Sequence, residues 1–227
     1  MEMTVNNTKS SCDKNKYQND GKIGFRFFKR AVDVCAGTMG LIVLIPVTLV
    51  VFLANLVTKD NGPVIYTQNR IGKNGKIFKM YKFRSMCVGA EETLKKYLAE
   101  NSEAYEEYKV YKKLKNDPRI TTVGKFLRKT SLDEIPQFLN LLNGTMSLVG
   151  PRPYMPHERQ DMGDFYDTII KNKPGITGLW QTSGRSNTTF DERLVYDADY
   201  DKKKSVLTDF KIIVKTFVNV FKKDGAV

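Results

Sequence analysis

The sequence predicts a mainly helical α+β protein attached to one face of a membrane. An uncharged apolar run at residues 34–57 is about as long as the hydrocarbon core requires of a helix. Alternating apolar and polar residues at 62–86, interrupted at residues 72–75, indicate a short β-hairpin, and helical spacing recurs towards the C-terminus. The 227 residues suffice for one domain with a membrane attachment but are short for two full domains.

The charge and the cysteines narrow the class of protein further. The formal net charge of +12 indicates an anionic partner: nucleic acid, the anionic face of a membrane or a phosphorylated substrate. No recognised nucleic-acid motif accompanies the charge, so we expect no nucleic-acid partner. Cys12, Cys35 and Cys87 form no CxxC pair, which predicts neither a disulfide framework nor a zinc site. His157, the single histidine, lacks a nucleophile motif beside it and predicts an ordinary surface residue.

The first 60 residues predict a tail and a membrane segment. Residues 1–22 have few large apolar side chains and are expected to be disordered, whereas residues 23–60 are expected to enter the membrane. Because positive charge marks the cytoplasmic side, a simple span would place one of two basic flanks on the wrong side. The flanking cations are Lys22, Arg26, Lys29 and Arg30 before the apolar run, and Lys59, Arg70, Lys73, Lys76, Lys79 and Lys82 after it.

Pro46 lies in the middle of the apolar run. A proline removes a backbone hydrogen bond and clashes with the preceding turn, so it favours a sharp bend. A re-entrant helix-break-helix that turns at Pro46 keeps both flanks on one face, and a proline-kinked transmembrane helix is the alternative. Asp33, at the edge of the run, could pair with Arg30 or Lys29, or could remain a solvated carboxylate at the interface.

Helices and loops alternate after the hairpin. Residues 90–114 contain neither Gly nor Pro and predict one exposed helix. Short helical pieces are expected at 126–128 and 135–142, and the Pro- and Gly-rich stretch that follows, through Gly184, predicts loops that form a site.

The C-terminal segment predicts a basic amphipathic helix, with lysines and other polar residues opposite an apolar stripe. Such a helix either packs on the core or lies in the headgroup layer of a membrane, and the apolar run upstream favours the membrane surface. The apolar stripe consists of Val206, Leu207, Phe210, Ile213, Val214, Phe217 and Phe221.

Two adjacent carboxylates, Asp133 and Glu134, precede a proline in the segment 130–137. One interpretation is a capping box in which Ser131 pairs with Glu134 at a helix start. Pro136 argues for a helix that begins near itself, because proline prefers the first helical position. That start leaves both carboxylates at the N-terminal edge, where the helix dipole keeps a carboxylate ionised, as a nucleophile or a magnesium ligand requires.

Cations recur around this pair in segments that Gly and Pro would hold rigid. Arg128 lies shortly before Asp133, Arg152 lies between Pro151 and Pro153, and Arg185 follows Gly184. Arginine is suited to bidentate recognition of phosphate. The end of the hairpin adds two more cations, Lys82 and Arg84.

Four segments, at residues 82–86, 128–137, 146–153 and 173–181, resemble the signature blocks of the bacterial monotopic phosphoglycosyl transferases. They occur in the order found in that family, and the resemblance extends over nearly everything from Phe25 to the C-terminus. Several blocks in register make this match specific, whereas an Asp-Glu pair alone would not.

The resemblance implies a reaction on the cytoplasmic face of the bacterial inner membrane. Asp133 matches the aspartate that attacks the sugar-bearing phosphorus of a UDP-sugar and releases UMP, and Glu134 matches its partner at a Mg²⁺ site. Undecaprenyl phosphate would then accept the sugar phosphate in a ping-pong reaction. The resemblance makes residues 61–227 a cytoplasmic catalytic domain and favours the re-entrant interpretation of Pro46, with anionic membrane lipids as partners and a homodimer left open.

The family also suggests roles for the cations. Arg152 and Arg185 match positions associated with the nucleotide sugar, Arg128 matches an arginine beside the nucleophile, and Lys82 and Arg84 are further substrate-binding candidates. The tail after Arg185 resembles that of relatives that act on hexoses, so galactose or glucose is the expected sugar, with N-acetylated sugars as the alternative.

Two departures from the family pattern affect the bend and the sugar contacts. Ile45 stands where many relatives have a serine before the membrane proline, and Ser186 stands where asparagine is frequent. A non-enzymatic membrane adaptor, in which the Asp-Glu pair only begins a helix, is the rival interpretation.

Overall fold

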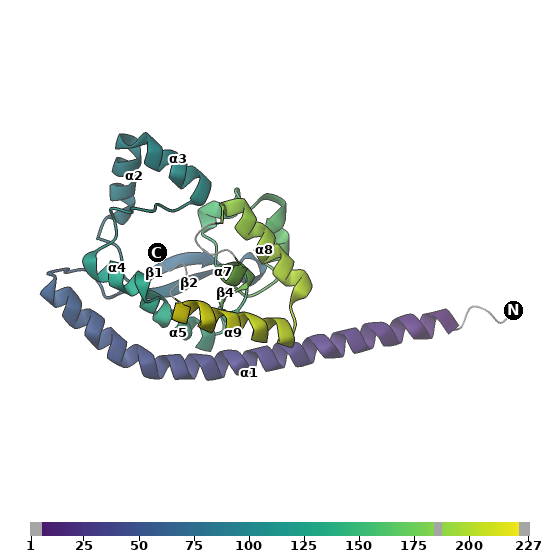
Figure 1. The fold of residues 1–227 in the computed structure, drawn as a ribbon. Coiled ribbons are helices and arrows are strands. Elements are labelled where there is room, and N and C mark those ends of the chain that lie inside the picture. The colour runs from purple at the N-terminus through teal and green to yellow at the C-terminus, as the bar shows by residue number, and fades with distance from the viewer. Residues whose placement is uncertain (1–5, 184–187, 223–227) are drawn as a thin grey trace.

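The structure is a computed structural model that describes the backbone of residues 6–183 and 188–222 and the side chains of residues 23–183 and 188–219. It is a mainly helical α+β fold with two small sheets (Figure 1). Its helices and strands are α1 (Asn6–Val57), β1 (Ile65–Ile71), η1 (Lys73–Gly75), β2 (Ile77–Phe83), α2 (Ala90–Glu100), α3 (Ser102–Tyr111), α4 (Thr122–Lys129), η2 (Leu132–Gln137), α5 (Phe138–Leu142), β3 (Ser147–Val149), η3 (Pro156–Arg159), η4 (Gly163–Phe165), α6 (Tyr166–Ile169), β4 (Gly175–Thr177), α7 (Leu179–Ser183), α8 (Phe190–Lys203) and α9 (Val206–Lys222), where η marks a 3-10 helix.

Helix α1 contains the apolar run and is the one described helix long and apolar enough to cross a membrane. Figure 1 shows it passing beneath the rest of the fold and bending towards its C-terminal end. The expected interruption at Pro46 is not seen, because the helix continues through this residue. A helix can bend at a proline while losing little more than one hydrogen bond. The predicted boundaries after residues 22 and 60, and re-entry itself, stay predictions.

The inner face of α1 packs on the core, whereas much of its outer face is apolar and exposed. Leu44 and Val51 are buried in a cluster with Phe83, Leu127 and Ile135. The exposed side chains include Phe27, Met39, Ile42, Ile45, Leu49, Val50, Leu53, Leu56 and Val57. Apolar surface is unfavourable in contact with water. An exposed apolar face of this size therefore indicates contact with a membrane or with another protein.

Two charged residues of α1 have partners other than those expected. Asp33 is buried and, instead of forming an ion pair with Lys29 or Arg30, accepts hydrogen bonds from Ser147 Oγ and the Leu148 backbone N–H. The alternative of a solvated Asp33 carboxylate is also wrong, because this residue is buried. Arg30 donates to the carbonyls of Leu141 and Leu142, where cations suit the C-terminal end of α5.

The predicted hairpin is confirmed. Strands β1 and β2 pair antiparallel from Ile65↔Phe83 to Ile71↔Ile77. The turn between them is the short helix η1, in which Asn74 and Gly75 have positive φ angles of 57° and 75°. Asn and Gly are the residues that tolerate this left-handed region best, which explains why this sequence turns here.

The exposed helix expected at residues 90–114 is instead two helices, α2 and α3, which project from the rest of the fold in Figure 1. The chain is extended at Asn101, whose side-chain Oδ1 accepts a hydrogen bond from the Ala104 backbone N–H. Asparagine is among the best N-cap residues, so it starts a second helix without any Gly or Pro.

The Pro- and Gly-rich stretch contains a second sheet that the sequence did not predict. Strands β3 and β4 pair in parallel, with Ser147 opposite Gly175 and Val149 opposite Thr177. Beside this sheet, Tyr154 packs edge-on against Phe190 of α8, with ring centroids 5.9 Å apart. Both belong to a core cluster with Ile71, Met162, Ile169, Leu194 and Ala198.

The C-terminal amphipathic helix is confirmed as α9, but of its predicted apolar stripe only Ile213, among the described side chains, packs on a core cluster. Asp209 and Ile212 are buried, whereas Leu207, Phe210 and Phe217 are 62%, 61% and 62% exposed. Phe221, the last residue of the predicted stripe, has no described side chain. The exposed stripe leaves α9 with an apolar surface that nothing in the described chain covers.

Candidate active site

Asp133 and Glu134 lie in the first turn of η2, which follows α4 directly. Ser131 precedes this turn in a left-handed conformation, with φ 56°, and its side chain makes no capping hydrogen bond. The capping-box interpretation is therefore wrong. The expected helix start at Pro136 is also wrong, because Pro136 lies inside η2 and α5 begins only at Phe138. The expected position of the carboxylates at the N-terminal edge of a helical segment is nevertheless what the structure has.

Lys82 of β2 lies between the two carboxylates. Its Nζ is 2.9 Å from Glu134 Oε1 and 3.8 Å from Asp133 Oδ2. The Asp133 side chain is only 12% exposed, whereas that of Glu134 is 39% exposed. The hairpin and η2 thus bring a cation from one segment to a carboxylate pair in another.

The two carboxyl groups differ in their electrostatic environment. Burial raises the pKa of Asp133, and the neighbouring Glu134 charge adds to the rise, although Lys82 and Arg128 favour the charged form. Partial burial also acts to raise the pKa of Glu134, but Lys82, Arg152 and a hydrogen bond from Gln137 outweigh it and leave the pKa lowered. Glu134 therefore remains an anion more readily than Asp133.

Arg128 is in the last turn of α4, and its positive charge favours the ionised form of Asp133. Its Nε donates a 2.9 Å hydrogen bond to Ser85 Oγ, just beyond β2. Burial lowers the pKa of Arg128, while the charges of Asp133 and Asp117 act to raise it. Asp117 is itself held by Arg119, whose Nη2 lies 2.6 Å from Asp117 Oδ2. Arg128 thus faces two carboxylates from different segments.

Arg152 follows strand β3, and its positive charge helps to lower the pKa of Glu134. Its backbone N–H donates to Asp197 Oδ2 at 3.0 Å, and its guanidinium lies 5.4 Å from the centroid of the Trp180 ring. Arg193 of α8 lies 5.2 Å from the same ring centroid. Cation–π contacts of this kind hold a guanidinium in place without consuming its hydrogen-bond donors.

Of the predicted site residues, Lys82 contacts both Asp133 and Glu134, and the charges of Arg128 and Arg152 favour the ionised forms of this pair. Arg84 is committed elsewhere: its Nη1 lies 2.9 Å from Asp60 Oδ1 and its Nε donates to the Pro63 carbonyl, which ties β2 to the end of α1. Arg185 and Ser186 lie outside the described residues.

Sequence reasoning missed the residues that hold these cations in position. Ser85 anchors Arg128, and Asp197 anchors the Arg152 backbone. Within α8, Arg193 and Asp197 are charged residues on the same face as buried Phe190 and Leu194. A charge on an otherwise apolar helix face was the available signal, because buried charges need partners.

The carboxylate pair fits a divalent cation of the magnesium type. Mg²⁺ usually takes one or two protein carboxylates and completes its shell with water and substrate phosphate oxygens. Asp133 and Glu134 supply such a pair, and the approach of Lys82 to both shows that the pair attracts a cation. Among the described residues no group of three or more His, Cys, Asp or Glu side chains forms a complete protein cage.

Comparisons with known proteins agree on one family. The family described as bacterial sugar transferase matches residues 24–223. The chain is 47% identical over 208 residues to the undecaprenyl-phosphate galactose phosphotransferase of Salmonella typhimurium, covering 92% of this chain and 43% of that protein. It is 41% identical over 202 residues to the exopolysaccharide production protein ExoY of Rhizobium meliloti, covering 87% of each.

A third relative is the UDP-glucose:undecaprenyl-phosphate glucose-1-phosphate transferase of Klebsiella pneumoniae, 42% identical over 203 residues. The match covers 86% of this chain and 40% of that protein, so the chain spans less than half the length of the Salmonella and Klebsiella relatives. With one family matching nearly the whole described chain and these relatives well above 30% identity, the chain belongs to the bacterial sugar transferase family.

Proposed function

We propose that the chain transfers a sugar 1-phosphate from a UDP-sugar to undecaprenyl phosphate and releases UMP. The names of the Salmonella and Klebsiella relatives state undecaprenyl phosphate as their acceptor, with galactose or glucose as the sugar. The observation that carries the proposal for this chain is the contact of Lys82 with both Asp133 and Glu134, to which Arg128 and Arg152 add the effect of their charges.

In the first step an Asp133 carboxylate oxygen attacks the phosphorus that carries the sugar. A new O–P bond forms, the bond from this phosphorus to the UMP oxygen breaks, and UMP leaves with that electron pair. The product is a sugar phosphate joined to Asp133 as an acyl phosphate. Lys82 and Arg128 favour the ionised form of Asp133 that attacks.

In the second step a phosphate oxygen of undecaprenyl phosphate attacks the same phosphorus. The bond to Asp133 breaks, the carboxylate is regenerated and the sugar is left on a lipid diphosphate. Phosphoryl transfer demands mainly positioning and neutralisation of charge on the phosphate oxygens, for which Arg128 and Arg152 are placed.

A magnesium ion would be held by Asp133 and Glu134. When bound, it supplies positive charge to the diphosphate oxygens of the donor. Glu134, with the lower pKa and the more exposed side chain, is the more available ligand of the two.

The proposal places the protein on the cytoplasmic face of the inner membrane, with α1 re-entering the bilayer and α9 lying at its surface. Support comes from the exposed apolar faces of both helices. Anionic lipid is the expected surface, since basic residues attract it. This placement lets a soluble nucleotide sugar meet a lipid-bound phosphate at a single site.

UMP release by the purified protein tests the proposal. With Mg²⁺ and a panel of UDP-sugars we expect release with UDP-galactose or UDP-glucose, and with UDP-N-acetylhexosamines if the alternative donor is right. Asp133→Asn removes the nucleophile while keeping the shape and should abolish release. Lys95→Ala, at an exposed position of α2, is the control and should retain activity. Equal, measurable rates for Asp133→Asn and the unchanged protein would reject Asp133 as the nucleophile. No release from the unchanged protein with any UDP-sugar would favour a membrane adaptor.

A further inference from the structure

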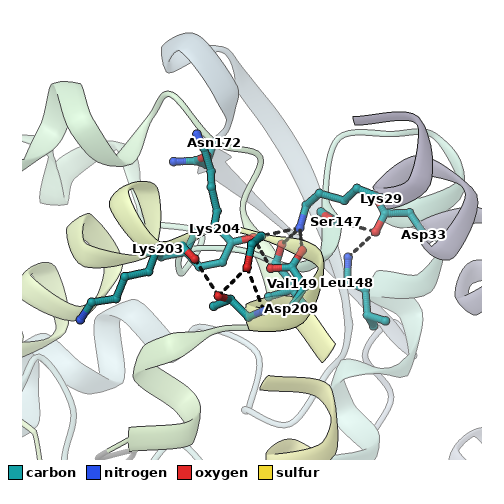
Figure 2. Close-up of polar contacts among 12 residues, drawn as sticks. Lys29, Asp33, Ser147, Leu148, Val149, Asn172, Lys203, Lys204 and Asp209 are labelled. Atoms are coloured by element: carbon teal, nitrogen blue, oxygen red, sulfur yellow. Dashed lines mark hydrogen bonds and ion pairs between the residues drawn. The ribbon is translucent and has the colours of Figure 1, made fainter. Parts of the chain in front are cut away.

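Lys29 of α1 is the centre of a largely buried polar network that joins α1 to β3 and α9 (Figure 2). Its Nζ donates to the Val149 carbonyl at 2.7 Å, to Tyr200 Oη at 2.9 Å and to Asp209 Oδ2 at 2.6 Å. Tyr200 Oη in turn donates to Asp209 Oδ1 at 2.7 Å. An ammonium has three protons, so Lys29 has a partner for each.

Asp33 lies one turn further along α1 and holds the same strand. As Figure 2 shows, it faces Ser147 and Leu148, which donate to its Oδ1 at 2.9 Å and 2.7 Å. Residues four apart share one helix face, so Asp33 and Lys29 act together on three consecutive residues of β3. The ion pair in this network is Lys29–Asp209. Removing one of the two leaves the other as a largely buried, unpaired charge, which lowers the free energy of unfolding.

Strand β3 leads directly into the segment that carries Arg152. Only Gly150 and Pro151 separate Val149 from Arg152. A Cβ at Gly150 would clash with the Lys173 carbonyl, so the two backbone segments approach each other closely here. Beyond it, the Arg152 N–H and Tyr154 Oη both donate to Asp197 Oδ2, at 3.0 Å and 2.7 Å. The segment is thus held by α1 at one end and by α8 at the other.

We propose that Lys29 and Asp33 are positioning residues for the transfer reaction: they fix β3 against the membrane helix, and β3 fixes the segment that carries Arg152. The inference rests on the proposed function. The Lys29–Asp209 ion pair would then affect activity as well as stability. It links α9 to α1, and Lys29 also holds β3, the strand that leads to Arg152. Displacements of the order of 1 Å in such a supporting shell can cost about 100-fold in rate.

A double-mutant cycle in the full chain separates positioning from general stability. Lys29→Met removes the ammonium but keeps an apolar chain of similar length, and it should lower kcat/KM for UMP release at least tenfold. Arg152→Lys keeps a positive charge but replaces a fixed guanidinium fork by a flexible ammonium, which depends less on backbone position. In the Arg152→Lys background, Lys29→Met should therefore lower kcat/KM less than threefold. Equal losses in both backgrounds would overturn the inference.

Hydrogen exchange provides a readout that needs no turnover. In Lys29→Met the backbone amides of residues 147–150 and 152 should exchange faster than in the unchanged protein, and Asp33→Ala should have the same effect. Asp33→Asn retains the Oδ1 acceptor and should restore most of the protection. Unchanged protection in both Lys29→Met and Asp33→Ala would contradict the inference.

The matched control is Lys203→Met in α8, whose side chain is 60% exposed and whose Nζ pairs with half-buried Asp199 at 3.0 Å. It should leave exchange and kcat/KM unchanged. If Lys29→Met does not fold, Tyr200→Phe removes one of its three acceptors and should give a smaller change of the same kind. An inactive unchanged protein would reject the proposed function, whereas exchange at residues 147–150 and 152 would still decide whether Lys29 and Asp33 hold β3.

Discussion

Asp133 and Glu134 are neighbours in the chain but differ as acids. Asp133 is nearly buried, while Glu134 is more exposed and bonded by Lys82. Their pKa values are shifted in opposite directions, upward for Asp133 and downward for Glu134. Adjacent carboxylates with separated pKa values suit different roles, here a nucleophile and a metal ligand.

Lys82 is the residue on which this pair depends most directly. Lys82→Met leaves two adjacent carboxylates without their shared cation, so they repel each other and the incoming phosphates. We expect kcat to fall by about 100- to 1000-fold, as for loss of one transition-state donor. Steady-state UMP release measures it. Lys79→Met, at an exposed position of the same strand, should change kcat little, and similar losses in both variants would contradict the role of Lys82.

Asp197 is fully buried beneath the Arg152 segment and should make stability depend on pH. Burial raises its pKa to about 6, from an ordinary value of 3.8, despite hydrogen bonds from Tyr154 and Arg152. The folded protein therefore binds this proton more tightly than the unfolded chain. The stabilisation is complete below about pH 4, amounts to about 3 kcal/mol at most, and is lost as the pH rises through about 6.

Asp197→Asn removes this titration. The unfolding free energy of the variant minus that of the unchanged protein should become more favourable as the pH rises from about 5 to about 7.5. Chemical denaturation in detergent at the two pH values measures the difference. A difference that stays constant, or that falls with pH, would show that Asp197 does not carry this proton.

Single residues were predictable from sequence where a local pattern surrounded them. Lys82, Arg128 and Arg152 stand in rigid or motif-bearing segments; Lys82 contacts the carboxylate pair, and the charges of the two arginines act on it. The partner of Arg84 was not predictable, because Asp60 lies at the end of another helix and only the tertiary fold brings the two together. The partners of Asp33 were not predictable either, because its hydrogen-bond donors lie on β3, far along the chain.

At the level of elements, the position of α4 depends on a close approach of its backbone at Gly124 to the backbone of Ser85. A Cβ at Gly124 would overlap the Ser85 carbonyl, so α4 can lie against this segment only because residue 124 is glycine. The contact matters for the site, since Arg128 on the same helix donates to Ser85. Helix position and arginine position are therefore linked.

Gly124→Ala should push α4 away from Ser85. We expect a loss of about 1–3 kcal/mol in unfolding free energy, as for overpacked cores, and a lower kcat as Arg128 moves from Asp133. Denaturation and UMP release measure the two effects. Gly24→Ala is the control, because nothing lies within 4 Å of its Cβ position, and it should be neutral or slightly stabilising. Full activity and stability of Gly124→Ala would contradict the close approach.

Elements with strong local signals were predictable, and those that depend on distant partners were not. The hairpin turn was marked by Gly72 and Gly75, and α9 by its apolar spacing. The break at Asn101 was missed because a cap acts through one side chain and leaves the surrounding pattern helical. Strands β3 and β4 span three residues each and pair across a long connection, so no local period identifies them.

At the scale of the whole molecule, two apolar faces remain uncovered. One runs along α1 and the other along α9, and near Lys29 and Asp209 the two helices are joined by an ion pair. A membrane surface would cover both faces while the site remains in contact with water.

Re-entry predicts that both termini are on the cytoplasmic side. Reporters fused to the N-terminus and, separately, to the C-terminus should both give the cytoplasmic signal in cells, because α1 would not carry the N-terminus across the lipid. A known single-span protein with the same reporters provides the control. An N-terminal reporter found in the periplasm would establish the proline-kinked span instead.

The most direct test of the proposed chemistry is mass spectrometry of the protein during turnover. After brief incubation with Mg²⁺ and UDP-galactose or UDP-glucose, without lipid acceptor, a sugar phosphate should be found on the peptide that contains Asp133, and adding undecaprenyl phosphate should remove it. Asp133→Asn should carry none. Formation of lipid-linked product at full rate, with no adduct on that peptide at any time, would contradict the covalent mechanism.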